Sequence, residues 1–491
     1  MQTVACPSCG APVAFRSHAS VMAVCEYCRA TVVKELDSVR DLGKMSEVLE
    51  DYSRIQLGTA GVLGGRSFTV VGRIQLRYDA GIWNEWYVLF DDGSDGWLGD
   101  ASSQYTMTTK RELPADWPGF EAVQVTRQYD VGFGPYVASD KRVAKCSGGQ
   151  GELPFRVGQG WEARVADFRR GPSFATLDYS DANLPDATPL LYAGNAVTLE
   201  GMKCQLLRDD DQIKASAGKV RGKVDVLQCP SCGTAIRYMP GLAANCVCPS
   251  CSTRLDASSP KVEVLLKGEE QERVQFTLPL GAVAKIGARS WQVLGAMRRE
   301  DDEGESWDEY LLYAPQGPFF WLVETREGWS RSQVLDDWPT PPLPAMHTVQ
   351  VDGVDYKRTW VYQARVVYAA GAFNWRVAAG DMVNVAEYEH GQNSLAAEYT
   401  KDELTWSRSA PVADDQVRAW FNLAPGKAAN APKAPSTDRD IAWKALLWMF
   451  GLNFIPLVAN FGATLAWMLV GAVALFLPPL LAPAGRPPEN D

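Results

Sequence analysis

The stretch VACPSCGAPVAF (Val4–Phe15) decides how this chain is interpreted, because it returns far downstream as LQCPSCGTAIRY (Leu227–Tyr238). The shared word CPSCG begins at Cys6 and again at Cys229. After the same fifteen residues, each word is followed by a second Cys-x-x-Cys pair. A constant shift between separated motifs indicates an internal duplication.

The duplication extends well beyond the cysteines. At nearly the same shift, GGRSF (Gly64–Phe68) matches GARSW (Gly287–Trp291), and later VADF (Val165–Phe168) matches VAEY (Val385–Tyr388). The register drifts by only a few residues over the whole unit. The sequence therefore predicts two copies of a ribbon followed by a larger module.

The larger modules have the pattern of strands. In SFTVVGRIQLRY, Ile74, Leu76 and Tyr78 alternate on one face, and aromatic or β-branched runs are separated by turns such as DDGSDG. This pattern predicts an antiparallel sandwich or barrel. One stretch differs, because apolar residues from Leu36 to Tyr52 recur every three or four positions, which predicts a helical connector.

Each cysteine set has the spacing of a zinc ribbon. Two cysteines separated by two residues can turn both sulfurs toward one cation, and a fifteen-residue hairpin can return the second pair. A closed four-thiolate site is structural, so we expect two structural zinc ions. A thioredoxin-like redox pair and a ribbon that has lost its metal stay open as alternatives. Cys246 is a spare thiol. The predicted metal ligands are Cys6, Cys9, Cys25, Cys28, Cys229, Cys232, Cys248 and Cys251.

Charge and targeting signals limit the function. The formal net charge is −11, which disfavours nucleic acid as a partner. The N-terminus lacks a basic and apolar leader, so paired cysteines indicate metal ligands in a reducing compartment. Phe461 to Leu481 contains no charged residue, which predicts a transmembrane helix, or a hairpin together with residues 441–458. We therefore expect anchoring to the cytoplasmic (inner) membrane, with the soluble domains in the cytoplasm.

The predicted fold class is mainly β, with two zinc ribbons, two antiparallel β-sandwich or barrel modules, and a C-terminal transmembrane helix or helical hairpin. The predicted boundaries are 1–34 for the first ribbon, 35–53 for the helical connector, 54–200 for the first module, 201–225 for a connector, 226–256 for the second ribbon, 257–412 for the second module, 413–440 for a linker and 441–482 for the membrane anchor.

Polar residues shared by the two copies are the candidate site residues. They can be cross-strand ion pairs that hold the fold, or they can form a ligand site. No serine-nucleophile, phosphate-loop or dinucleotide motif is found. The tryptophans Trp83, Trp86, Trp97, Trp307 and Trp321 fit a core or an interface. The shared pairs are Arg66/Arg289, Glu85/Glu309, Arg156/Arg376, Asp167/Glu387 and Asp178/Glu398.

The ordered features LG, GRSF, VG, W-x-E-W, WL, FRV and DY resemble a bacterial domain-of-unknown-function family, number 4178. The family motif around GE-x-P-W is present as GELPF (Gly151–Phe155) and, altered, as GAFNW (Gly371–Trp375). The resemblance implies β-rich modules, often preceded by a zinc ribbon and sometimes tethered to the membrane. It also implies protein partners, among them polyamine-synthesis-like enzymes and small membrane proteins.

Two functional hypotheses follow. The first is a non-enzymatic, membrane-tethered cytoplasmic scaffold or adaptor with structural zinc ribbons and duplicated binding modules. The second is a sensor or enzyme-like protein that binds a small cationic ligand, such as a polyamine, in an acidic β-pocket. Glu85, Glu152 and Asp178 would supply the negative charge.

Overall fold

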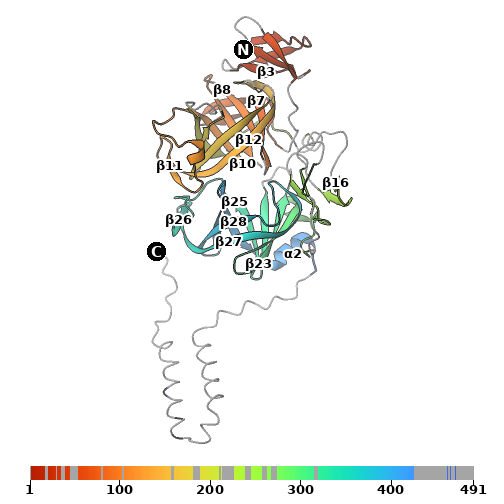
Figure 1. Ribbon diagram of the computed structural model, residues 1–491, viewed down its shortest axis with the longest axis vertical. Coiled ribbons are helices and arrows are strands. Elements are labelled where there is room, and N and C mark those ends of the chain that lie inside the picture. Colours follow the sequence, from red (N-terminus) through yellow and green to blue (C-terminus); the bar gives the residue numbers. More distant parts are fainter. Residues whose placement is uncertain are drawn as a thin grey trace. The chain divides into compact units, whose positions relative to one another are not determined.

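The computed structural model describes most of the chain up to residue 424 (Figure 1). The chain forms two compact units, Met1–Ala424 and Pro425–Asp491, and every strand among the described residues belongs to the first unit. The described residues are 2–16, 20–28, 30–34, 39–44, 53–78, 81–101, 104–155, 157, 160–180, 188–209, 212, 226–237, 245–256, 263–266, 274–314, 319–424, 462, 465 and 470.

Each half of the first unit begins with a small ribbon, made of a two-stranded hairpin and a three-stranded antiparallel sheet. Ribbon 1 contains β1 (Gln2–Ala5), β2 (Pro12–Phe15), β3 (Met22–Val24), β4 (Ala30–Lys34) and β5 (Val39–Lys44). Ribbon 2 contains β16 (Val226–Gln228), β17 (Ala235–Arg237), β18 (Asn245–Val247), β19 (Arg254–Asp256) and β20 (Glu263–Leu266).

Module 1 is a barrel in which antiparallel pairing runs from β7 through β8, β9, β10, β15, β14, β13 and β12 back to β7. Strands β6 (Ala60–Leu63) and β11 (Gln128–Asp130) pair at its margins, and η1 (Phe120–Ala122) is a short 3₁₀ helix. The barrel strands are β7 (Arg66–Tyr78), β8 (Gly81–Phe90), β9 (Asp95–Ala101), β10 (Gln104–Arg111), β12 (Pro135–Leu153), β13 (Trp161–Arg170), β14 (Ser173–Asp178) and β15 (Leu190–Val197).

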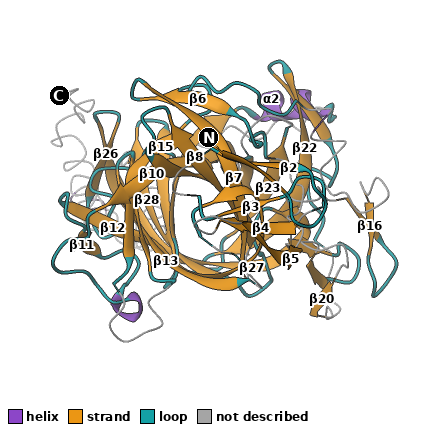
Figure 2. Ribbon diagram, turned by 90° about the horizontal axis from the view of Figure 1, so that it is seen from above, coloured by secondary structure: helices purple, strands orange, loops and turns teal. Residues whose placement is uncertain are grey.

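Module 2 repeats this ring with β22, β23, β24, β25, β30, β29, β28 and β27. Figure 2 shows that strands dominate the described chain, with helix limited to short segments. Helix α2 (Asp414–Phe421) follows the last strand and packs Val417 and Phe421 into the core of module 2. The strands of module 2 are β21 (Val283–Ile286), β22 (Arg289–Glu300), β23 (Ser306–Tyr313), β24 (Phe320–Thr325), β25 (Gly328–Val334), β26 (Thr348–Val351), β27 (Val354–Phe373), β28 (Met382–His390), β29 (Asn393–Tyr399) and β30 (Leu404–Val412).

Glycines make the closure of each ring possible. In module 1, Gly72 of β7 pairs with Gly151 of β12, and a Cβ atom at Gly72 would lie 1.8 Å from the backbone oxygen of Glu152. Gly151 has a φ of +67°, which favours glycine. The same pairing joins Gly295 to Gly371 in module 2. The sequence matches at these positions therefore mark the seam of the barrel.

The ribbon sheets are continuous with the barrels. Beyond the seam, the end of β12 pairs with β3, and the end of β27 pairs with β18 in the same way. The alternation predicted for β7 is confirmed, because Ile74 and Leu76 belong to one buried cluster and Tyr78 packs against it. Closed pairing settles the predicted sandwich or barrel in favour of the barrel.

The predicted helical connector is wrong at its centre. Residues 39–44 form strand β5, which pairs antiparallel with β4. Hydrogen bonding to an existing sheet edge outweighs a weak periodicity of apolar residues. Ribbon 2 contains the equivalent strand β20, which pairs with β19.

The predicted fold class is also wrong in its C-terminal element. Among the described residues, no helix is both long enough and apolar enough to cross a membrane, so the transmembrane helix or hairpin is not supported. The prediction rested on hydropathy alone, which measures transfer from water but not helix formation. Nearly all of the predicted anchor, 441–482, lies outside the described residues.

Candidate functional site

The two cysteine sets each gather around one point. In ribbon 1, the Sγ atoms of Cys6 and Cys28 lie 3.6 Å apart, as do those of Cys9 and Cys25. In each set, all four sulfur atoms lie within 4.8 Å of one another. A tetrahedral zinc ion bonded to four sulfurs at about 2.3 Å would separate them by about 3.8 Å. The donor set and its spacing therefore fit zinc.

Ribbon 2 has the same geometry. The sulfur atoms of Cys229 and Cys251 lie 3.7 Å apart, and those of Cys232 and Cys248 lie 3.5 Å apart. Cys246 packs instead in the buried cluster of the ribbon, on strand β18. The structure thus brings together the eight predicted ligands as two groups that could each hold one metal ion.

Glu152, a predicted pocket residue, holds ribbon 1 to module 1. Its carboxylate accepts a 2.6 Å hydrogen bond from the backbone N–H of Arg16 and a 3.1 Å bond from the Ser20 hydroxyl. The Arg16 guanidinium completes the contact as an ion pair at 3.4 Å. Glu152 is 1% exposed and does not line the cavity described next. The sequence identified its importance but assigned the wrong role.

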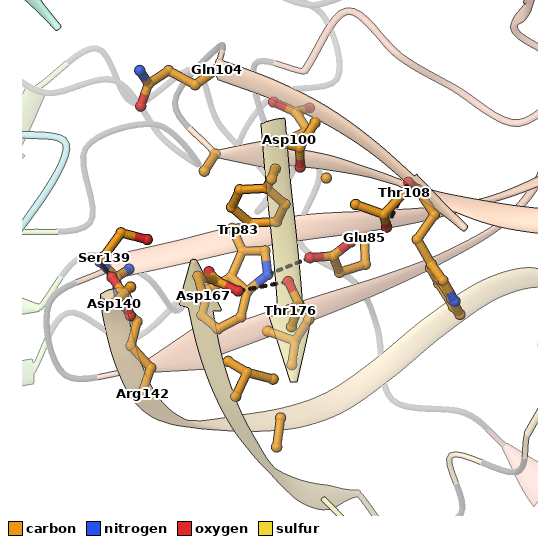
Figure 3. A pocket seen from close by; sticks show the side chains of 18 of the residues that line it. Trp83, Glu85, Asp100, Gln104, Thr108, Ser139, Asp140, Arg142, Asp167 and Thr176 are labelled. Carbon is orange, nitrogen blue, oxygen red and sulfur yellow. Dashed lines mark hydrogen bonds and ion pairs between the residues drawn. The ribbon is translucent and has the colours of Figure 1, made fainter. Parts of the chain in front are cut away.

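Residues of module 1 form most of the lining of a cavity of about 280 Å³ (Figure 3), and residues of module 2, including Glu403 and Thr405, line the rest. Eight-stranded barrels are just wide enough for their side chains to fill the interior, or for one small ligand. Leu76, Trp97, Phe155 and Trp161 contribute apolar and aromatic lining. Within the module, the charged lining residues are Glu85, Asp100, Asp140, Asp167, Asp178, Arg142 and Arg169. The cavity therefore has more acidic than basic groups.

Hydrogen bonds hold the acidic side chains in place. Glu85 accepts a 2.9 Å bond from the indole nitrogen of Trp83, which lies two residues earlier on β8. Elsewhere in the barrel, Asp167 of β13 accepts a 2.7 Å hydrogen bond from the Thr176 hydroxyl of β14. Figure 3 draws both hydrogen bonds among the residues that line the cavity. They present two carboxylates from different strands to one space.

Burial changes the ionisation of these acids. Burial, and then the negative charges of Asp167, Asp100 and Asp178, raise the pKa of Glu85 to about 8, although the Trp83 hydrogen bond opposes the shift. Burial also raises the pKa of Asp167. A cation placed among these groups would favour their ionised forms.

Arg142 is already paired within the module. Its guanidinium forms a close ion pair with Oδ2 of Asp140 and stacks on the Tyr78 ring at 4.3 Å. Four polar atoms of the lining residues are buried and have no hydrogen-bond partner among the described residues, namely Oδ1 of Asp140, Nε1 of Trp161, Nη1 of Arg169 and Oδ1 of Asn374. Buried polar atoms are normally satisfied, so this pattern is typical of a ligand or water site.

The equivalent acids of module 2 surround one of its own side chains. Nη1 of Arg299 lies 3.1 Å from Glu309 and 2.9 Å from Glu398, and its side chain is 4% exposed. Trp307 donates a 2.7 Å hydrogen bond to Glu309, as Trp83 does to Glu85. Glu387 accepts a 2.7 Å bond from the Tyr362 hydroxyl.

The shared candidate residues thus separate into two groups. Glu85, Asp167 and Asp178 line one cavity, whereas Arg66 pairs with Asp92 at the surface. Arg156 lies outside the described residues, and Arg376 is exposed. Sequence reasoning missed the Asp140–Arg142 pair and Arg299. Arg299 is equivalent to Leu76 of the first copy, which lies on the inward face of an alternating strand. That equivalence was the signal that could have found Arg299.

These features define a class of protein, namely one built from duplicated β-barrel modules that each follow a four-cysteine ribbon. The family model described as a domain of unknown function (DUF4178) matches residues 56–197 and 279–413. The chain belongs to this family, in two tandem copies, as the resemblance indicated. A comparison with curated proteins finds no match.

Proposed function

We propose that the chain is a binding protein whose first module takes a small organic cation into its acidic barrel cavity. The observation that carries this proposal is the excess of carboxyl groups over guanidinium groups in a cavity also lined by aromatic rings. Carboxylates attract the charge, and indole faces bind cations through their π-electrons. The geometry favours this cationic-ligand hypothesis over a purely structural role for the shared acids.

The size of the cavity supports a small ligand. Its volume of about 280 Å³ lies near the lower end of the range of small-molecule pockets, roughly 300–1,000 Å³. A short alkyl amine or guanidine fits this space, and its stem would contact Leu76 and Phe155. In this proposal each cysteine ribbon holds a structural zinc ion that fixes the ribbon's fold.

Thermal-shift and calorimetric titrations of the full chain test the proposal. We expect putrescine, agmatine and ethylguanidinium to raise the melting temperature, whereas acetate, an anion of similar size, leaves it unchanged. The double variant E85Q/D178N should bind each cation at least about tenfold more weakly, because it removes both carboxyl groups that would pair with the cation. If none of the cations binds the wild type at millimolar concentration, the proposal is wrong.

A scaffold role is the second candidate, supported by one surface feature. Strand β27 leaves Trp360 65% exposed and the adjacent Val361 57% exposed. Large exposed aromatic residues are frequent at the centre of protein interfaces. Proximity labelling in cells tests this role: a protein set labelled by the wild type and lost with W360S supports it. Identical sets for the wild type and W360S contradict it.

A further inference from the structure

The two modules share one strand arrangement but have different residues at one equivalent position of β7 and β22. Leu76 pairs with Trp83 across β7 and β8, and Arg299 pairs with Trp307 across β22 and β23. Both tryptophans donate to a glutamate two residues later, at 2.9 Å in module 1 and 2.7 Å in module 2. Leu76 and Arg299 are therefore equivalent, and both are inward-facing.

In module 2 this position supplies a cation to the acids. The Arg299 guanidinium bonds Glu309 and Glu398 and lies 5.7 Å from the centre of the Trp307 ring. The equivalents of all three partners, Glu85, Asp178 and Trp83, line the cavity of module 1. In module 1 the equivalent of Arg299 is Leu76, whose side chain carries no charge. Arg142 and Arg169 bring guanidinium groups to the cavity from β12 and β13, but module 1 has none at the position equivalent to Arg299.

The acids of module 1 are also shorter. The strand pairings make Asp167 equivalent to Glu387 of module 2. In the same way, Asp178 is equivalent to Glu398. Each aspartate reaches one methylene less far into the barrel. Shorter acids together with a shorter residue at position 76 leave space where Arg299 lies in module 2. The indole nitrogen of Trp161, which has no hydrogen-bond partner among the described residues, belongs to a side chain that lines the same cavity.

We propose that module 1 binds an alkylguanidinium whose head lies between Glu85 and Asp178 beside Trp83, and that Arg299 is a built-in copy of this ligand in module 2. This inference rests on the proposed function and specifies its ligand class and stoichiometry. The chain then has one open site and one site closed by its own side chain. Binding a planar head with several N–H donors satisfies two carboxylates at once.

Transplanting the arginine tests the inference. The variant L76R should fill the module 1 site and weaken ethylguanidinium binding at least about tenfold. The matched control V143R adds the same charge at a position 46% exposed and should bind as the wild type does. A folded L76R that keeps wild-type affinity overturns the inference. Its melting temperature and bound metal report whether L76R has folded.

Removing the arginine provides an independent test. The variant R299A leaves Glu309 and Glu398 without their cation, so its melting temperature should fall, and ethylguanidinium should raise it more than it raises that of the wild type. R365A, which removes an exposed arginine paired with Glu300 at 3.3 Å, is the control and should show no extra rescue. Equal shifts in R299A and the wild type overturn the mimicry.

The choice of probe separates this inference from the proposed function. Tetramethylammonium carries charge but no N–H donor, and it should bind at least about tenfold more weakly than ethylguanidinium. If the wild type binds tetramethylammonium equally well, the guanidinium inference fails while the cation-binding proposal stands. If neither cation binds, the proposed function fails as well.

Discussion

At the scale of the residue, Glu85 is the group whose chemistry matters most. It shares its cavity with Asp100, Asp167 and Asp178, and burial raises its pKa to about 8. The indole of Trp83 fixes one of its oxygens. A glutamate with this environment is protonated at neutral pH in the ligand-free protein and gives up its proton when a cation arrives.

The raised pKa predicts how binding depends on pH. Because only ionised Glu85 pairs with a cation, affinity for ethylguanidinium should strengthen as the pH rises from 6 to 9. Calorimetry across this range measures the effect, and proton release at pH 7 should accompany binding. E85Q should flatten the profile, whereas E121Q, at an exposed acid, should leave it unchanged. A flat profile in the wild type would contradict this assignment.

The same shift predicts a change in stability without ligand. The folded pKa of about 8 lies above the ordinary value of 4.5, so ionisation of Glu85 in the folded protein is unfavourable. Stability from this group is present below pH 4.5 and is lost as the pH rises through 8. At pH 9 the melting temperature of E85Q should therefore lie roughly several degrees above that of the wild type. At pH 5 scanning calorimetry should show a much smaller difference.

At the scale of the element, the seam between β7 and β12 decides whether module 1 closes. The strands were predictable because their apolar residues alternate, but strand order was not, since β7 pairs with a strand about seventy residues later in the chain. The helical periodicity of residues 36–52 misled for a related reason. Pairing with β4 is a tertiary effect that local pattern does not contain.

The seam predicts the effect of one methyl group. G72A places a Cβ atom 1.8 Å from the Glu152 backbone oxygen, so it should destabilise the chain by about 3 kcal/mol. Urea unfolding measures this loss. G119A is the control, because a Cβ atom there meets nothing within 4 Å and φ is −64°. Equal stability of the two variants would show that β7 and β12 do not meet as described.

At the scale of the whole molecule, the duplication produced copies that share one fold but differ in their interior side chains. The two four-cysteine groups that could hold metal ions were predictable from the sequence, because their spacing is typical of ligands around a tetrahedral ion. The cavity was only partly predictable. Glu85 and Asp178 were found by comparing the copies, but Arg299 has no counterpart of its own kind, so a search for shared residues passes over it. Hydropathy misled at the C-terminus, where no membrane-spanning helix is found among the described residues.

The two cysteine groups predict a metal count for the chain. Purified protein should contain two zinc ions per chain by elemental analysis, and C9S and C232S should each reduce the count to one, because each removes a ligand from one group only. C204S, which changes a cysteine outside both groups, should keep both ions. Retention of two ions in C9S would contradict the assignment of ribbon 1.

The stoichiometry of cation binding tests the central claim most directly. Calorimetric titration of the full wild-type chain with ethylguanidinium at pH 9, where Glu85 is ionised, should give one site per chain. That value follows because module 1 is open and Arg299 occupies the equivalent place in module 2. Absence of binding would contradict the cation site in module 1. Two equal sites per chain would contradict the closed state of module 2.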